Sequence, residues 1–278
     1  MLIDTHCHLD AGAFTQSPAQ LLAAAQAQGV SYIVIPAVSR HNFAAVQHLA
    51  HSSPHLTYAL GIHPFCVPSA TEADLQHLAA QLERCSTDPQ LVAVGEIGLD
   101  FFVPTLTTAE MRDKQYYFYE AQLKLARKFA LPVLLHGRKA QDEIVKYLRR
   151  HQGVGGIAHA FNGSFQQAEQ LITLGFALGF GGAMTFTRAK QIRRLASTID
   201  LSHLVLETDA PDMAPAWLDP KNHPEPLNQP AELAAIAQVL AELRQTDIAH
   251  IKQETTRTAL RVLPRLQQWH QRQLRKTT

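Results

Sequence analysis

Cysteine is scarce in this chain of 278 residues, and the three cysteines present form no close pair. Cys7, Cys66 and Cys85 make no CxxC motif and are too few, and odd in number, for a disulfide framework. The sequence therefore argues against a small disulfide-stabilised secreted domain. It favours a reducing, cytoplasmic setting.

Long hydrophobic runs and an excess of either charge are also missing. No apolar stretch approaches the roughly 18 residues needed to span a bilayer, and the opening MLIDTHCHLD lacks the basic segment of a signal peptide. The formal net charge of +1 argues against a nucleic-acid coat protein or a polybasic membrane binder, although it permits a local basic patch. We therefore expect no membrane association, and nothing in the sequence indicates an obligate protein partner.

Short apolar runs alternate with longer segments whose apolar residues recur at i, i+3 and i+4. The runs predict strands at 2–6, 31–36, 57–62, 91–96, 132–136, 155–159, 176–180 and 203–208. The intervening segments predict helices near 18–28, 40–52, 72–85, 108–130, 139–151, 165–174 and 188–199, with two more near 230–243 and 247–270.

Eight β/α repeats predict an α/β fold, a (β/α)8 TIM barrel with extra C-terminal helices. We expect a single domain over residues 1–278, in which the tail 265–278 frays from the last helix. A doubly wound open sheet is the alternative, but it would place a glycine-rich turn after the first strand, where His-Cys-His stands instead. The proline-rich segment 211–229 is expected to be a loop over the strand ends.

Six side chains able to bind a metal fall at or just beyond the ends of predicted strands. They are His6, His8, Glu96, His136, His159 and Asp209. Divalent cations need several imidazoles and carboxylates that converge on one point. In a TIM barrel the C-terminal ends of the strands supply such a point, so this placement predicts a metal-dependent hydrolase.

Each of these residues also has a simpler interpretation when taken alone. The His6-x-His8 spacing can arise by chance among fifteen histidines, His136 and His159 could be core histidines, and Glu96 could pair with a basic neighbour. The recurrence of all six at equivalent strand ends favours the metal site. Cys7, between His6 and His8, should face the opposite way as a small buried side chain.

Two carboxylates are assigned to catalysis. Asp209 follows the last predicted strand, beside the first, and could act as the general base that takes a proton from water. Glu96 can bind one cation with each oxygen and is the candidate bridging ligand. Glu207, two residues before Asp209, is a weaker candidate that would support the site from behind.

His63 and Arg138 are assigned to substrate binding. His63 ends the third strand in GIHP, and we assign it to substrate orientation rather than to metal. Arg138 lies two residues beyond His136, and a guanidinium matches a phosphoryl group through two parallel hydrogen bonds. Lys139 and Arg188 could extend this basic rim, although an ordinary solvated charge is the favoured interpretation of both.

Together these segments resemble the TatD-like metal-dependent deoxyribonuclease/hydrolase family of the amidohydrolase superfamily, and most of all its YjjV-type branch. The matching segments, in the order of the family, are DTHCHLD (4–10), GIHP (61–64), VGEIGLD (94–100), LLHGRKA (134–140), HAFNGS (159–164), LGFGG (178–182) and LETDAPD (206–212).

The resemblance implies a TIM barrel with two divalent metal ions as cofactors. One would bind to His6, His8, Glu96 and Asp209, and the other to Glu96, His136 and His159. It also implies hydrolysis of ester bonds, with 3′-to-5′ exonuclease action on DNA among the family's activities.

The chain departs from the family pattern at two places. The basic stretch common after the last barrel strand is replaced by DPKNHPEPLNQP, in which only Asn228 and Pro230 keep the pattern. Thr258 stands where an Asn is common in a terminal helix. The first departure weakens the inference to nucleic acid.

The principal hypothesis is phosphodiester hydrolysis, with DNA or a small phosphoester as the substrate. A second hypothesis keeps the metals and changes the substrate to a small amide, ester or lactone. A non-catalytic metal-binding protein is a third. The histidine and carboxylate ligands suit zinc, manganese, nickel or, less well, magnesium, so the metal itself stays undetermined.

Overall fold

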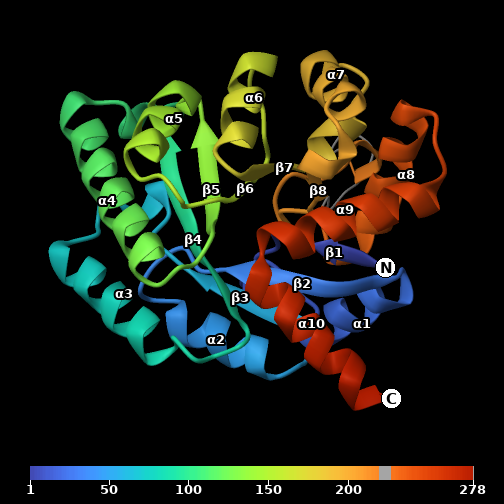
Figure 1. Ribbon diagram of the computed structural model, residues 1–278, viewed down its shortest axis with the longest axis horizontal. Helices are drawn as coiled ribbons and strands as arrows, with labels where there is room; N and C mark the ends of the chain where they lie inside the picture. The colour runs from blue at the N-terminus through green and yellow to red at the C-terminus, as the bar shows by residue number, and fades with distance from the viewer. Residues whose placement is uncertain (219–226, 278) are drawn as a thin grey trace.

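Eight parallel strands form one sheet in the computed structural model, which describes residues 1–218 and 227–277. The strands follow one another in chain order, and the helices pack around them (Figure 1). The strands are β1 (Leu2–Asp4), β2 (Val30–Pro36), β3 (Leu56–Leu60), β4 (Leu91–Asp100), β5 (Val133–Arg138), β6 (Gly156–Ala158), β7 (Phe176–Phe180) and β8 (Leu204–Leu206). The helices are α1 (Pro18–Ala27), α2 (Phe43–His51), α3 (Glu72–Arg84), α4 (Ala109–Lys128), α5 (Gln141–Arg150), α6 (Phe165–Thr173), α7 (Lys190–Thr198), α8 (Leu233–Arg244), α9 (Ile248–Val262) and α10 (Pro264–Thr277).

The sheet closes on itself where β8 meets β1. The Thr5 N–H donates to the Leu206 carbonyl at 3.1 Å, and the Asp209 N–H donates to the His6 carbonyl at 2.8 Å. Each of the other neighbouring strand pairs is parallel and hydrogen-bonded, and the register shifts within the β1–β2, β3–β4 and β4–β5 pairs. The (β/α)8 TIM barrel expected from the sequence is confirmed, and the open doubly wound sheet is excluded.

The apolar side chains form two buried layers, one inside the barrel and one between the strands and the outer helices. Small and branched residues fill the interior, among them Ile3, Val34, Ala93 and Val205. Because both faces of each strand are buried, the strands are nearly continuous apolar runs, as expected for parallel sheets.

The expected helix at 247–270 is two helices, α9 and α10, which meet at Leu263. Pro264 breaks the helix because it has no backbone N–H and its ring clashes with the preceding turn, whereas it is tolerated at the first position of α10. Residues 265–277, expected as a tail, belong to α10; Thr278 lies outside the described residues.

Side chains of α9 and α10 close one end of the barrel. Ala259, Val262, Leu263 and Leu266 join the interior cluster, and the Trp269 indole N–H donates to the Pro54 carbonyl, just before β3. Figure 1 shows both helices crossing the barrel. These contacts are made at the N-terminal ends of the strands, so the C-terminal ends are left as the mouth.

Several helix boundaries follow the signals in the sequence. Ser17 caps α1, and Pro18 is the first residue of this helix. Gly29 and Gly175 follow α1 and α6 with φ of +84° and +87°, a conformation that glycine adopts without a steric penalty. Among the described residues, no helix has the length and apolar character required to cross a membrane. Of the proline-rich segment 211–229, residues 219–226 lie outside the described residues.

Candidate metal centre

Glu96 lies at the centre of the barrel mouth, with its side chain only 2% exposed. The pairing of β4 with β5 shifts register between Val94 and Ile97, so Glu96 stands at an irregularity within a longer strand rather than at the strand end expected from the sequence. Such irregularities re-aim side chains, and they are common beside active sites. The two carboxylate oxygens of Glu96 face two different groups of ligands.

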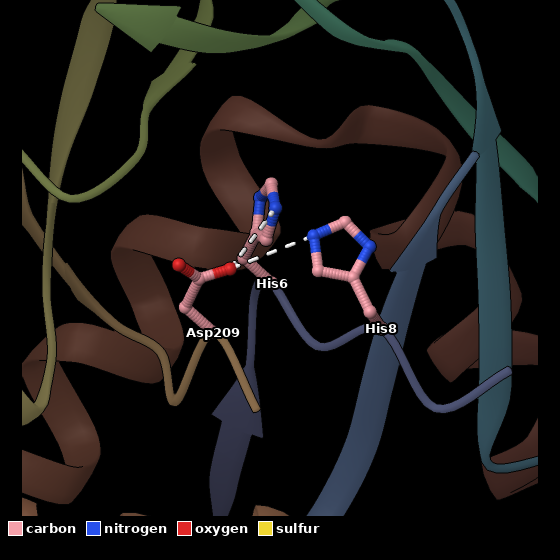
Figure 2. Close-up of side chains that lie close together, drawn as sticks. All are labelled: His6, His8 and Asp209. Atoms are coloured by element: carbon pink, nitrogen blue, oxygen red, sulfur yellow. Dashed lines mark ion pairs between the residues drawn. The ribbon is translucent and has the colours of Figure 1, made fainter. Parts of the chain in front are cut away.

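The first group gathers around Glu96 Oε2. His6 Nε2 lies 3.1 Å from this oxygen and His8 Nε2 lies 3.5 Å from it. Asp209 Oδ1 lies 3.7 Å from His6 Nε2 and 3.6 Å from His8 Nε2. Figure 2 shows the imidazole rings of His6 and His8 on either side of this Asp209 oxygen, each joined to it by a dashed line. The structure thus brings together His6, His8, Glu96 and Asp209.

His6 and His8 lie beyond the end of β1, not on the strand that the sequence predicted. Their segment nevertheless keeps strand-like hydrogen bonds to both neighbouring strands. The Thr5 N–H donates to the Leu206 carbonyl on β8, and the Cys7 N–H donates to the Val34 carbonyl on β2 at 3.1 Å. Alternate side chains therefore face the same way. As expected, Cys7 is buried on the opposite side.

Asp209 is held in a left-handed conformation, with φ of +56°, which Asp tolerates better than most residues. The preceding residue is fixed by the buried Asp4, whose carboxylate accepts the Thr208 hydroxyl at 2.6 Å and the Thr208 N–H at 2.9 Å. A direct link therefore joins the segment of His6 to the segment of Asp209.

The second group surrounds Glu96 Oε1. His159 Nε2 lies 2.8 Å and His136 Nδ1 lies 3.0 Å from this oxygen. His63 Nε2 lies 3.4 Å from the same oxygen and 3.2 Å from His136 Nδ1. His63, assigned from the sequence to the substrate, is thus buried among the metal-binding candidates, where ligation is a second role open to it.

Two further carboxylates support the second group. Asp100 Oδ2 lies 3.0 Å from His136 Nε2, the ring nitrogen that faces away from Glu96. Glu207 Oε1 lies 3.7 Å from His159 Nδ1 and accepts the Ala160 N–H. Carboxylates behind ligating histidines fix the ring orientation and tautomer. Glu207 was expected beside the site from the sequence, whereas Asp100 was not, although Glu96 and Asp100 are four residues apart on one strand.

Burial and mutual contact shift the pKa values of these groups in opposite directions. Burial lowers the pKa of His6 to about 3 and raises that of Asp209 to about 7. Burial would raise the pKa of Glu96, but the surrounding His63, His159 and His6 hold it well below its usual range. For His159, burial is outweighed by Glu96 and Glu207, so its pKa is raised well above the usual value.

The geometry of the first group fits a divalent cation. Four tetrahedral ligands, each about 2.1 Å from an ion, lie roughly 3.4 Å from one another. The ligand atoms of His6, His8 and Asp209 all lie within 4.8 Å of one another, as do those of the groups formed by His6, Glu96 and His159 and by His63, Glu96 and His136. Imidazole and carboxylate ligands suit zinc, manganese and nickel.

The basic residues expected at the rim take different positions. The Arg138 guanidinium stacks over Phe102, with Cζ 3.7 Å from the ring centroid, and Lys139 Nζ lies 4.8 Å from the same ring. Arg188 instead stacks on Phe186 and lines an open cavity of about 240 Å³ together with Met213. Arg138 and Lys139 therefore pack on one ring, and Arg188 packs on another.

The chain is similar in sequence and in structure to known metal-dependent hydrolases. A family described as TatD related DNase matches residues 3–264. The uncharacterised metal-dependent hydrolase YjjV of Escherichia coli K12 is 40% identical over 255 residues, which cover 90% of this chain and 93% of the relative. Its crystal structure, described as that of a TatD homologue, has a TM-score of 0.86 at 36% identity and covers 95% of this chain and 98% of its own. The 3′-5′ ssDNA/RNA exonuclease TatD of Edwardsiella piscicida is 32% identical over 262 residues, or 93% and 97% of the two chains.

Proposed function

Because this chain belongs to the TatD family of metal-dependent hydrolases, we propose that it hydrolyses phosphodiester bonds of DNA, in the manner of a 3′-5′ exonuclease. The relative from Edwardsiella piscicida carries that activity in its name. The observation that carries the proposal is the position of Glu96, whose two carboxylate oxygens face two separate groups of candidate ligands.

Two divalent cations would share Glu96. One would be held by His6, His8, Glu96 and Asp209, and the other by Glu96, His136 and His159. Asp100 and Glu207 would orient the two histidines of the second set. When bound, such cations polarise a phosphoryl oxygen and lower the pKa of a water molecule to roughly 7.

Asp209 would act as the general base, and Glu96 would hold the site in register. The side chain of Asp209 is only 13% exposed, and its Oδ1 lies between His6 Nε2 and His8 Nε2, where it would face a water molecule at the first cation. Arg138 would bind a phosphoryl oxygen from the rim, and His63, buried at the base of the same mouth, would orient it.

A small amide, ester or lactone is the second candidate substrate. The net charge of +1 favours it, because strong binding to a long polyanion usually relies on many basic side chains. The basic loop common in the family is also replaced here by DPKNHPEPLNQP, most of which lies outside the described residues.

The test compares a single-stranded oligonucleotide bearing a 3′ hydroxyl with a panel of lactones and amides, each with added Mg²⁺, Mn²⁺ or Zn²⁺. We expect stepwise shortening of the oligonucleotide from its 3′ end. Turnover of a lactone or amide, with the oligonucleotide left intact under all three metals, would reject the proposal in favour of the second candidate.

The role of Asp209 is tested by Asp209→Asn, which keeps the shape of the side chain but removes the base. We expect kcat to fall about 10²- to 10⁴-fold, with an unchanged circular dichroism spectrum. Asp113→Asn, at an exposed position on α4, is the control and should retain full activity. Full activity of Asp209→Asn would remove the assigned base.

A further inference from the structure

Two exposed phenylalanines stand beside the second ligand group. Phe65 is 52% exposed and Phe102 is 45% exposed, although most large apolar side chains of a folded protein are buried. Phe65 lies in the short helix η1 (Pro64–Cys66) that follows β3, and Phe102 comes two residues after β4. Since β3 and β4 are neighbours in the barrel, both rings lie on adjacent loops of the mouth.

Phe65 is fixed over the histidines of the second group. Its ring centroid lies 4.7 Å from that of His63 and 6.0 Å from that of His136. The Phe65 N–H donates to His63 Nδ1 at 3.0 Å, so the same imidazole that faces Glu96 also holds the turn that presents Phe65.

Phe102 is fixed in a comparable way through Asp100. Asp100 Oδ1 accepts the N–H groups of Phe102 at 2.9 Å and Val103 at 3.1 Å, while its other oxygen contacts His136. One buried carboxylate therefore ties the Phe102 turn to the metal-binding candidates. Each exposed ring is held at a set position relative to Glu96.

Cations accompany these rings. The Arg138 guanidinium lies over Phe102, and Lys139 lies near the same ring. Cation–ring contacts hold Arg138 at the rim while leaving its N–H groups able to donate. Aromatic faces next to Arg and Lys are the combination that binds single-stranded nucleic acid, in which bases stack on rings and phosphates pair with cations.

We propose that Phe65 and Phe102 form a stacking platform for the bases next to the scissile phosphodiester, with Arg138 and Lys139 on the adjoining phosphates. The inference rests on the proposed function and adds to it a contact with the bases, which can stack on these rings only where the strand is unpaired. Stacking accepts every base, so we expect little sequence preference. A small lactone or amide has no phosphate to pair with Arg138 and Lys139.

The experiment compares an oligonucleotide with an otherwise identical one whose two 3′-terminal nucleotides are abasic. The wild-type enzyme should hydrolyse the intact strand with a kcat/KM about 5- to 100-fold higher. Phe65→Ala and Phe102→Ala should each reduce this preference, mainly by raising KM for the intact strand. Phe102→Tyr should retain it, because the aromatic face remains.

Tyr117→Ala is the matched control, since Tyr117 is 54% exposed but lies on the outer helix α4. It should keep the full preference. Equal hydrolysis of intact and abasic strands by the wild type would overturn the platform while leaving the proposed function in place, because DNA would still be cut.

Binding provides a readout that does not depend on activity. Fluorescence anisotropy of a labelled single strand, measured with a chelator present, should show binding that Phe65→Ala and Phe102→Ala weaken and Tyr117→Ala does not. Equal binding by all three variants would overturn the platform. If the wild-type protein neither binds nor cuts the single strand, both the platform and the proposed function are rejected.

Discussion

Gly179 on β7 leaves the space that the Glu207 carboxylate occupies. A Cβ atom at this position would lie 2.2 Å from Glu207 Oε2 and 2.7 Å from its Cδ. Glu207 is only 1% exposed, so its carboxylate has little room to move aside. We expect Gly179→Ala to displace Glu207 from His159 and to destabilise the fold by about 1–3 kcal/mol. The measurement is the free energy of unfolding in urea, together with metal affinity.

Gly12→Ala is the control for this prediction, because nothing lies within 4 Å of a Cβ at Gly12. It should leave both quantities close to those of the wild type. If Gly179→Ala behaves in the same way, Glu207 is not held by packing against β7.

For single residues, the sequence predicted which candidate ligands converge but not which atoms each of them contacts. His6, His8, Glu96 and Asp209 meet as expected because strand ends share one side of the barrel. The contact of Asp100 with His136 and that of His63 with Glu96 were not predicted, because the register between β3, β4 and β5 decides which atoms touch. A register shift at Glu96 is not visible in an apolar run.

Among the elements, a polar cluster joins α2, β3 and the start of β4 at the closed end of the barrel. Asp88 Oδ2 accepts the Tyr58 hydroxyl at 2.7 Å and lies 2.7 Å from His51 Nε2, while Oδ1 accepts the Gln90 N–H at 2.9 Å. Burial would raise the pKa of Asp88, but these hydrogen bonds outweigh it and lower the pKa below its usual value of 3.8.

Asp88→Asn should therefore lower stability at neutral pH by about 1–2 kcal/mol. A depressed carboxyl pKa contributes stability above the pKa of the unfolded chain and loses it as the pH falls through the folded value. The difference in Tm between wild type and variant should stay constant from pH 7 to 5 and shrink below about pH 4. Asp113→Asn, at an exposed position of α4, should show no difference at any pH. A constant gap down to pH 3 would contradict the charge argument.

The elements themselves were predicted closely where periodicity and capping agree, as in α1 and α6. The exceptions have local physical causes. Pro264 divides the expected last helix, and β4 continues through Asp100 because pairing with β5 extends past Glu96. The sequence shows Pro264 directly, but only the barrel shows that α10 is needed to cover the strand ends.

Across the whole molecule, the candidate ligands are drawn from five separate places in the barrel. They lie beyond β1, β6 and β8 and within β4 and β5, so a bound cation would link parts of the chain as much as 203 residues apart, from His6 to Asp209. An unfolded chain cannot present this arrangement. Metal binding must therefore favour the folded state.

Removal of metal should accordingly lower the Tm. A cation present at 100 times its dissociation constant stabilises the folded protein by about 2.7 kcal/mol, which corresponds to roughly 5–10 °C in a chain of this size. Differential scanning calorimetry after dialysis against a chelator, and again after Mn²⁺ or Zn²⁺ is restored, measures the shift. Glu96→Gln should abolish most of it, because Glu96 belongs to both ligand groups. His48→Gln, at an exposed histidine of α2, should retain it. An equal shift in Glu96→Gln would mean that the metal binds elsewhere.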